Sequence, residues 1–208
     1  MMESRGGEGP SPQSGWGRIG VFLDVPNWET GLHDRRCELS ATVAAGHAAN
    51  DPNALLNQSA RAIRARVASR GPVVIARAYG RCYIGNGSSP NSKGPTLGLL
   101  AADREGFAPR PRFVSGSQSE KREDVDMPLY RDIAEAVYRD LVDTVVVVSG
   151  DGDMTYVAET VKGCGKRFVS MFWSESANRR LLAFADDFEA LDGTAGVDSR
   201  LVPTPKGD

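Results

Sequence analysis

The sequence contains little cysteine and almost no histidine. Its 208 residues include three cysteines and two histidines, and the cysteines lie far apart and outside any CxxC pattern. Disulfide frameworks and zinc sites need paired or clustered cysteines, so we expect neither, and we predict that all three thiols are reduced. His33 and His47 have the chemistry of general bases, but nothing in the sequence places them near a site. We therefore expect both histidines at the surface.

The sequence also lacks long apolar runs. No stretch approaches the roughly 18 residues of a membrane span, and the N-terminal segment MMESRGGEGPSPQSGWG has no apolar core of a secretory signal. We therefore expect a cytoplasmic protein without membrane contact. Walker A and GxSxG patterns are missing too, which removes support for an ATPase or a serine hydrolase. The net charge of −2 argues against a protein that coats nucleic acid through bulk electrostatics, although it leaves room for a local basic path.

What is present is the composition of one globular domain. Hydrophobic residues make up 40% of the 208 residues, which is enough for a substantial core, and charged residues make up an ordinary 25%. Residues 1–16 are rich in glycine, proline and serine, and residues 194–208 lack periodic apolar positions, so both are predicted to be flexible tails. The folded domain is expected to span residues 17–193.

Within that domain, short β-branched runs alternate with segments of helical apolar spacing, a pattern typical of a parallel sheet wrapped by helices. The fold class is therefore predicted to be α/β. Strands are expected over residues 18–24, 72–79, 112–115, 143–149 and 167–171, and helices over 53–69, 96–105, 126–141, 154–163 and 177–184. Residues 31–50 and 85–94 show no clear period and stay unassigned.

Acidic residues fall where strands end and helices begin. Asp24 ends the run RIGVFLD, Asp151 and Asp153 follow VVVVSG, and Asp126 stands at the start of the helix that opens MPLYRDI. The carboxyl ends of parallel strands meet at one edge of a sheet, so these side chains are expected to converge. Clustered carboxylates repel one another unless a cation lies among them, and oxygen ligands without Cys or His suit Mg²⁺ or Mn²⁺.

A structural alternative exists for these residues. Aspartate is a favoured N-cap, so Asp126 and Asp153 could each cap the helix that follows, and Asp151 could serve the turn. Taken singly, each residue favours capping. Asp24 fits this alternative poorly, because an acid directly after VFL needs a partner. Taken together, the four acids favour a metal site.

Four motifs resemble the NYN domain family, in its LabA/DUF88 branch of PIN-like nucleases. RIGVFLDVPNW resembles the family's first strand, in which an Asp is followed three positions later by an Asn, and VDMPLYRDI is similar to a helix start with two acids. VVVVSGDGDM is similar to the family's SGDxDF motif, and FWSESANRRLLAFADDFEALD resembles its closing segment. Their order holds over residues 18–192. In this sequence Met154 replaces the usual aromatic residue, and Pro26 lies between the Asp and the Asn.

The resemblance implies a PIN-like three-layer sandwich, with a central, mostly parallel sheet flanked by helices, and metal-dependent ribonuclease activity. The acids expected to be catalytic and to bind the metal are Asp24, Asp126, Asp151 and Asp153, with Asp132 as the second acid of the helix motif. Asn27 and Ser149 would support the metal or the scissile phosphate. Hydrolysis would use a water activated by one or two ions of Mg²⁺ or Mn²⁺, and RNA would be the partner.

Basic and aromatic residues have two interpretations each. Arg110, Arg112, Lys121 and Arg122 precede Asp126 and could contact the RNA backbone, with Lys121 and Arg122 nearest to the site, although a solvated loop is slightly favoured. Arg61, Arg64, Arg66 and Arg70 are expected on the solvated surface of a helix. Trp28 is expected to be buried rather than stacked on a base, and Tyr83 could be either.

Two other functions compete with a ribonuclease. One is a regulatory RNA-binding scaffold that keeps the fold without turnover, and the other is a metal-dependent phosphoesterase that acts on small substrates. The presence of all four acids favours the ribonuclease. The sequence DVPN, where many phosphatases with a covalent Asp carry DxD, disfavours the phosphoesterase. The oligomeric state is left open, with a homodimer as one option.

Overall fold

The structure is a computed structural model that describes residues 15–42, 52–84, 94–115 and 125–192. In chain order its elements are β1 (Ile19–Asp24), α1 (Val25–Thr42), α2 (Pro52–Ala68), β2 (Val73–Ile84), β3 (Gly94–Pro95), α3 (Leu97–Arg104), β4 (Ala108–Ser115), α4 (Asp126–Tyr138), β5 (Thr144–Val148), α5 (Met154–Gly163), β6 (Arg167–Phe172), α6 (Arg179–Phe184) and β7 (Asp187–Ala190).

The strands of the described residues form one seven-stranded sheet, which confirms the predicted α/β class with a mostly parallel sheet. The strand order is β3-β2-β1-β5-β6-β7, and β4 pairs with the opposite edge of β2. Every pairing is parallel except that of β3 with β2. The two central strands, β1 and β5, are buried along their whole length, as their continuous apolar sequences predict.

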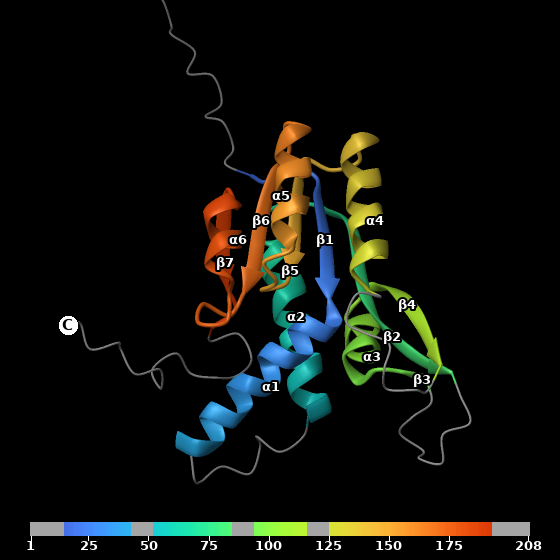
Figure 1. Cartoon of the computed structure of the whole chain (residues 1–208), viewed down its shortest axis with the longest axis vertical. Coiled ribbons are helices and arrows are strands. Elements are labelled where there is room, and N and C mark those ends of the chain that lie inside the picture. Colours follow the sequence, from blue (N-terminus) through green and yellow to red (C-terminus); the bar gives the residue numbers. More distant parts are fainter. Residues whose placement is uncertain (1–14, 43–51, 85–93, 116–124, 193–208) are drawn as a thin grey trace, which may run out of the picture.

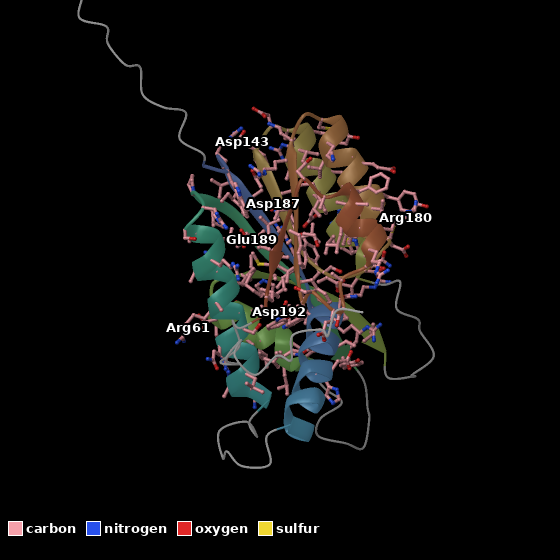
Figure 2. The ribbon with its side chains drawn as sticks, turned by 90° about the vertical axis from the view of Figure 1, so that its left-hand side faces the viewer. Arg61, Asp143, Arg180, Asp187, Glu189 and Asp192 are labelled. Atoms are coloured by element: carbon pink, nitrogen blue, oxygen red, sulfur yellow. The ribbon has the colours of Figure 1, made fainter. Side chains whose placement is uncertain are left out.

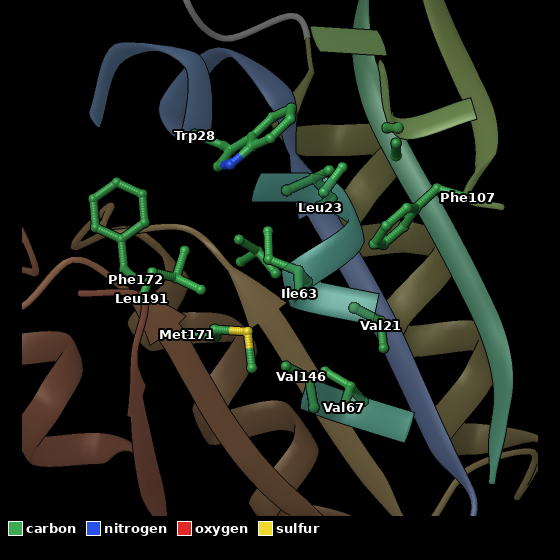
Figure 3. Packing of buried hydrophobic residues seen from close by; sticks show 14 of the residues in the cluster. Val21, Leu23, Trp28, Ile63, Val67, Phe107, Val146, Met171, Phe172 and Leu191 are labelled. Atoms are coloured by element: carbon green, nitrogen blue, oxygen red, sulfur yellow. The ribbon is translucent and has the colours of Figure 1, made fainter. Parts of the chain in front are cut away.

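Helices cover both faces of this sheet, so the molecule has three layers. One hydrophobic cluster joins the sheet to α1, α2 and α3, and a second joins the opposite face to α4, α5 and α6. Figure 3 shows part of the first cluster, in which Ile63 and Val67 of α2 lie over Val21, Val146 and Met171 of the sheet. The framework that holds the ends of β1 and β5 is therefore packed from both sides.

The carboxyl ends of the parallel strands point toward one edge of the sheet (Figure 1). Asp24, the last residue of β1, is in register with Tyr79, while β2 continues for five more residues to Ile84. β3 and β4 pair with that extension. The β2 and β4 strands therefore project beyond the end of β1 and form a wall beside the acids expected there.

Several elements differ from the sequence prediction. The unassigned segment 31–50 lies partly in α1, whose first turn tolerates Pro26 because helix-start amides need no partner within the helix. β4 begins at Ala108 rather than at residue 112. Pro109 and Pro111 argue against a strand, but β4 pairs with β2 alone among the described strands, and an edge strand can hold prolines. The short strands β3 and β7 were not predicted.

Individual side chains bear out or correct other expectations. Trp28 is fully buried, as expected, and its indole N–H donates to Ser59 Oγ at 3.0 Å. Trp16, the last residue of the predicted N-terminal tail, packs in the core. His33 is exposed, as predicted, whereas His47 lies outside the described residues. Cys82 and Cys164 are free thiols. The predicted tail 194–208 also lies outside the described residues.

The expectation that Arg61, Arg64, Arg66 and Arg70 lie on a solvated surface is incomplete, because Arg66 and Arg70 bind a buried carboxylate. Arg66 Nε lies 2.8 Å from Glu189 Oε2, and Arg70 pairs with the other oxygen of this buried carboxylate. Figure 2 shows Glu189 beside α2, toward the sheet, whereas Arg61 points outward. The partner of these arginines comes from a strand more than 100 residues later, which explains why the helix alone gave no sign of it.

No helix of the described residues is both long and apolar enough to cross a membrane.

Candidate functional site

Asp24 is the centre of the candidate site. It is only 4% exposed, because β2 and β5 flank it and α1 begins at the next residue. Its Oδ1 accepts a hydrogen bond from the backbone N–H of Asn27 at 3.3 Å, and its Oδ2 accepts one from Ser149 Oγ at 2.9 Å. A buried carboxylate is costly unless hydrogen-bonded, and these two donors hold its orientation.

A network of hydrogen bonds ties the loop after β5 to the start of α1. Asn27 Oδ1 accepts the N–H of Gly150 at 2.9 Å, and Ser149 Oγ accepts the N–H of Asp151 at 3.2 Å. Asn27 and Ser149, both predicted as support residues, therefore connect two segments more than 120 residues apart. The structure brings Asp24 and Asp151 into one network through Ser149.

The charges of the acids act on one another. The pKa of Asp24 is raised to about 7, mainly by burial and also by the negative charges of Asp126 and Asp151, against the opposing effect of the hydrogen bonds from Asn27 and Ser149. Asp126 opens α4 and is half-buried, and Asp151 is half-buried too. Residues more than 100 positions apart in sequence are thus close enough for their charges to act on one another.

Tyr130 faces the same acids and was missed as a site residue. Burial is the main cause of its raised pKa, and the charges of all four acids raise it further. Its phenol is therefore held in the neutral form, in which the O–H can donate a hydrogen bond. The sequence signal was available, since Tyr130 follows Asp126 by four positions and residues at this spacing share a helix face. The same residue also fits an apolar helix stripe, so the sequence alone does not assign Tyr130 to the site.

The capping alternative finds partial support. Asp151 does serve the turn, because its Oδ1 accepts the N–H of Asp153 at 3.0 Å. Asp153 occupies the N-cap position of α5, but its side chain makes no capping hydrogen bond. Asp126 is the first residue of α4 rather than its cap, which is Val125. Neither Asp126 nor Asp153 is therefore explained as a side-chain N-cap.

Replacing Asp153 by Ala tests this point. Loss of a working N-cap costs about 1 kcal/mol, whereas an exposed side chain without a capping bond costs less than about 0.5 kcal/mol. We expect the smaller value in urea denaturation with a chelator present. A loss of about 1 kcal/mol would show that Asp153 caps α5 in solution.

The donor set fits a hard divalent cation, although the carboxylates do not form a closed cage. Among the residues that the structure describes, no group of three or more His, Cys, Asp or Glu side chains is arranged to hold a metal ion. Mg²⁺ commonly binds through one or two carboxylates and keeps several waters, so it does not need such a cage. A buried carboxylate with a pKa of about 7 beside two further acids is the environment that a cation would stabilise.

Asp132 belongs to a different cluster. It is buried, accepts a hydrogen bond from the Tyr79 hydroxyl at 2.9 Å, and pairs with Arg77, Arg110 and Arg131. Its carboxylate is thus engaged by cations, unlike that of Asp24. Arg110 and Arg112 lie in β4, whereas Lys121 and Arg122 lie outside the described residues.

The three-layer fold with its central, mostly parallel sheet is that of the PIN-like class of domains. A family model described as the NYN domain matches residues 18–192. The chain therefore belongs to the NYN domain family.

The chain also has a similar solved structure but no match among curated proteins. The fold is similar to the crystal structure of a protein of unknown function from Vibrio parahaemolyticus RIMD 2210633, with a TM-score of 0.56 and 20% sequence identity. That match covers 88% of this chain and 97% of the other, and at this identity it shows the fold alone. A search of curated proteins finds no match.

Proposed function

We propose that the chain is a ribonuclease that hydrolyses RNA phosphodiester bonds with Mg²⁺ or Mn²⁺. The observation that carries this proposal is the Asp24 carboxylate, which is buried at the end of β1, oriented by Asn27 and Ser149, and repelled by Asp126 and Asp151. A group held in this way is destabilising unless a cation or a proton neutralises it. A site for cation-assisted hydrolysis explains why the chain keeps it.

Each residue has a role in this proposal. Asp24, Asp126 and Asp151 would hold the cation, and Asp153, on the exposed rim of the loop, would bind it or orient the attacking water. When bound, the cation would lower the pKa of the water and stabilise charge on the phosphate oxygens. Ser149 and Asn27 hold the loop and Asp24 in place. Tyr130, kept neutral, would donate its O–H to the phosphate or to a water.

A substrate panel tests the proposal. Purified protein is incubated with labelled RNA, labelled DNA and a small generic phosphoester, each with Mg²⁺, Mn²⁺ or a chelator. We expect RNA to be cleaved with either ion and left intact with chelator. RNA that binds without being cleaved would instead indicate a regulatory scaffold, and turnover of the small phosphoester alone would indicate a phosphoesterase. Either result would contradict the proposal.

The branch of the family, the cellular location and the domain bounds also belong to this proposal. Membership of the LabA/DUF88 branch and a cytoplasmic location stay predictions, as does a single domain over residues 17–193. These predictions agree with the proposal that the substrate is RNA inside the cell. A pulldown of cross-linked RNA from cell fractions tests the location and the substrate together.

A further inference from the structure

Three arginines surround the single buried carboxylate of Asp132. Arg77 of β2 lies 3.0 Å from Oδ2, Arg110 of β4 lies 3.4 Å from the same oxygen, and Arg131 of α4 lies 3.5 Å from Oδ1. The Tyr79 hydroxyl also donates to Oδ2. Guanidiniums from three different elements therefore meet at one point on the α4 side of the sheet.

The charges of this cluster do not balance. Among the residues that the structure describes, one carboxylate faces three guanidiniums, which leaves an excess of two positive charges. Asp132 is almost completely buried, whereas the Arg110 side chain is 47% exposed and that of Arg131 is 78% exposed. The negative charge thus lies beneath the surface, and the positive charge lies above it. Structural ion pairing needs only one guanidinium here, in addition to the hydroxyl of Tyr79.

The strand register extends this positive surface toward the candidate site. Tyr79 pairs with Arg110, and two residues further along Arg81 pairs with Arg112. Side chains two apart on a strand share a face, so Arg81 and Arg112 lie on the same face as the cluster. Asp24 is in register with Tyr79. The two further arginines therefore lie on the part of the wall that projects beyond the end of β1 (Figure 1).

The geometry points to a binding surface for the phosphate backbone of an RNA strand, formed by Arg77, Arg81, Arg110, Arg112 and Arg131. We name these five residues the arginine face. This inference rests on the proposed function, because it assigns the surface by which the substrate reaches Asp24. Guanidiniums bind phosphate in a bidentate manner, and successive arginines on one strand face are about 6.6 Å apart, of the same order as a nucleotide repeat.

An acidic polypeptide is the competing occupant, and the position of the surface disfavours it. The arginine face adjoins a site suited to phosphodiester chemistry, so a phosphate backbone that follows the arginines would continue directly to Asp24. The edge strand β4 also contains Pro109 and Pro111, which lack backbone donors. A peptide could therefore not use continuous strand pairing along this edge.

The test compares two double variants that each remove two positive charges. Arg110→Gln/Arg131→Gln neutralises the two exposed arginines of the face that contact Asp132 and leaves Arg77 and Tyr79 as partners for Asp132. Arg61→Gln/Arg139→Gln is the matched control, since both residues are exposed and paired with Glu105 and Glu135 elsewhere. Binding of labelled single-stranded RNA is measured by fluorescence anisotropy with chelator, so that no turnover occurs, and melting curves check the fold.

We expect the face variant to bind about tenfold more weakly at moderate salt, and the magnitude of its salt slope to fall by about 1.4. The control should bind like the wild type. Arg110→Lys/Arg131→Lys should recover most of the affinity, because it keeps the charge. Equal binding by the face variant and the control would overturn the proposal, as would competition by polyglutamate as strong as that by unlabelled RNA.

The outcomes separate this surface from the hydrolytic function. Arginine-dependent binding by a wild type that cleaves nothing with Mn²⁺ would uphold the arginine face and refute the ribonuclease. Cleavage with Mn²⁺ at an unchanged KM in the face variant would uphold the ribonuclease and refute the arginine face.

Discussion

Replacing Asp24 by Asn is expected to lower the rate of Mn²⁺-dependent RNA hydrolysis by about a thousandfold, because the contribution of a metal site is several kcal/mol. Asn has the same shape and can still accept from Asn27 and bond to Ser149, so the loop geometry should persist. What is lost is the negative charge that would hold the cation. Single-turnover cleavage of labelled RNA measures this effect.

The matched control for this substitution is Asp187→Asn. Asp187 also carries one carboxylate on a strand, pairs with Arg167 at 3.6 Å, and lies on β7 away from the acids. Its rate should stay within about twofold of the wild type. Wild-type activity in Asp24→Asn, at ordinary metal concentrations, would remove Asp24 from the site.

The same substitution is expected to stabilise the metal-free protein above pH 7. The pKa of Asp24 is about 7 in the folded state and about 3.8 in the unfolded chain. Because the pKa of Asp24 is higher in the folded state, protonation of this carboxyl group stabilises the folded protein relative to the unfolded chain. This contribution to stability is complete below about pH 3.8. It is lost as the pH rises through about 7. The difference between the two pKa values corresponds to a loss of about 4 kcal/mol of stability at most, and Asn, which carries no charge, should avoid this loss.

The measurement is the difference in the free energy of unfolding between Asp24→Asn and the wild type, with chelator, from pH 4 to pH 8. The difference should grow in favour of Asn up to about pH 7 and then level off. Adding Mn²⁺ should raise the melting temperature of the wild type in a saturable way and leave that of Asp24→Asn unchanged. A pH-independent difference, or an equal response of both proteins to Mn²⁺, would contradict the electrostatic account.

The location of the candidate site was predictable, because the residues beside each acid indicate where a strand ends. A carboxylate directly after a buried strand is visible in RIGVFLD, and the parallel topology brings the end of that strand beside the end of VVVVS. The role of Tyr130 was not predictable in the same way, because a tyrosine on an apolar helix stripe also fits the core. Only the folded structure shows which side of the stripe faces the acids.

The elements that were missed depend on distant partners. The segment 31–50 has no helical period, yet α1 extends to Thr42, and its beginning is anchored by Trp28 and Leu32 in the core. The start of β4 is a strand only because β2 supplies a parallel edge, which Pro109 and Pro111 alone would not suggest. Tertiary pairing outweighs local preference in both cases.

The hydrogen bond between Ser149 and Asp24 has a consequence for synthesis of the protein. It joins positions 125 residues apart, and it depends on β1 and β5 lying side by side. Such long-range parallel pairing forms late, since a large loop must close before any contact compensates for its entropy. A chain still emerging from the ribosome has β1 long before it has β5. The acids are therefore brought together only once most of the protein has been made, and the candidate site cannot form in a nascent chain that still lacks β5.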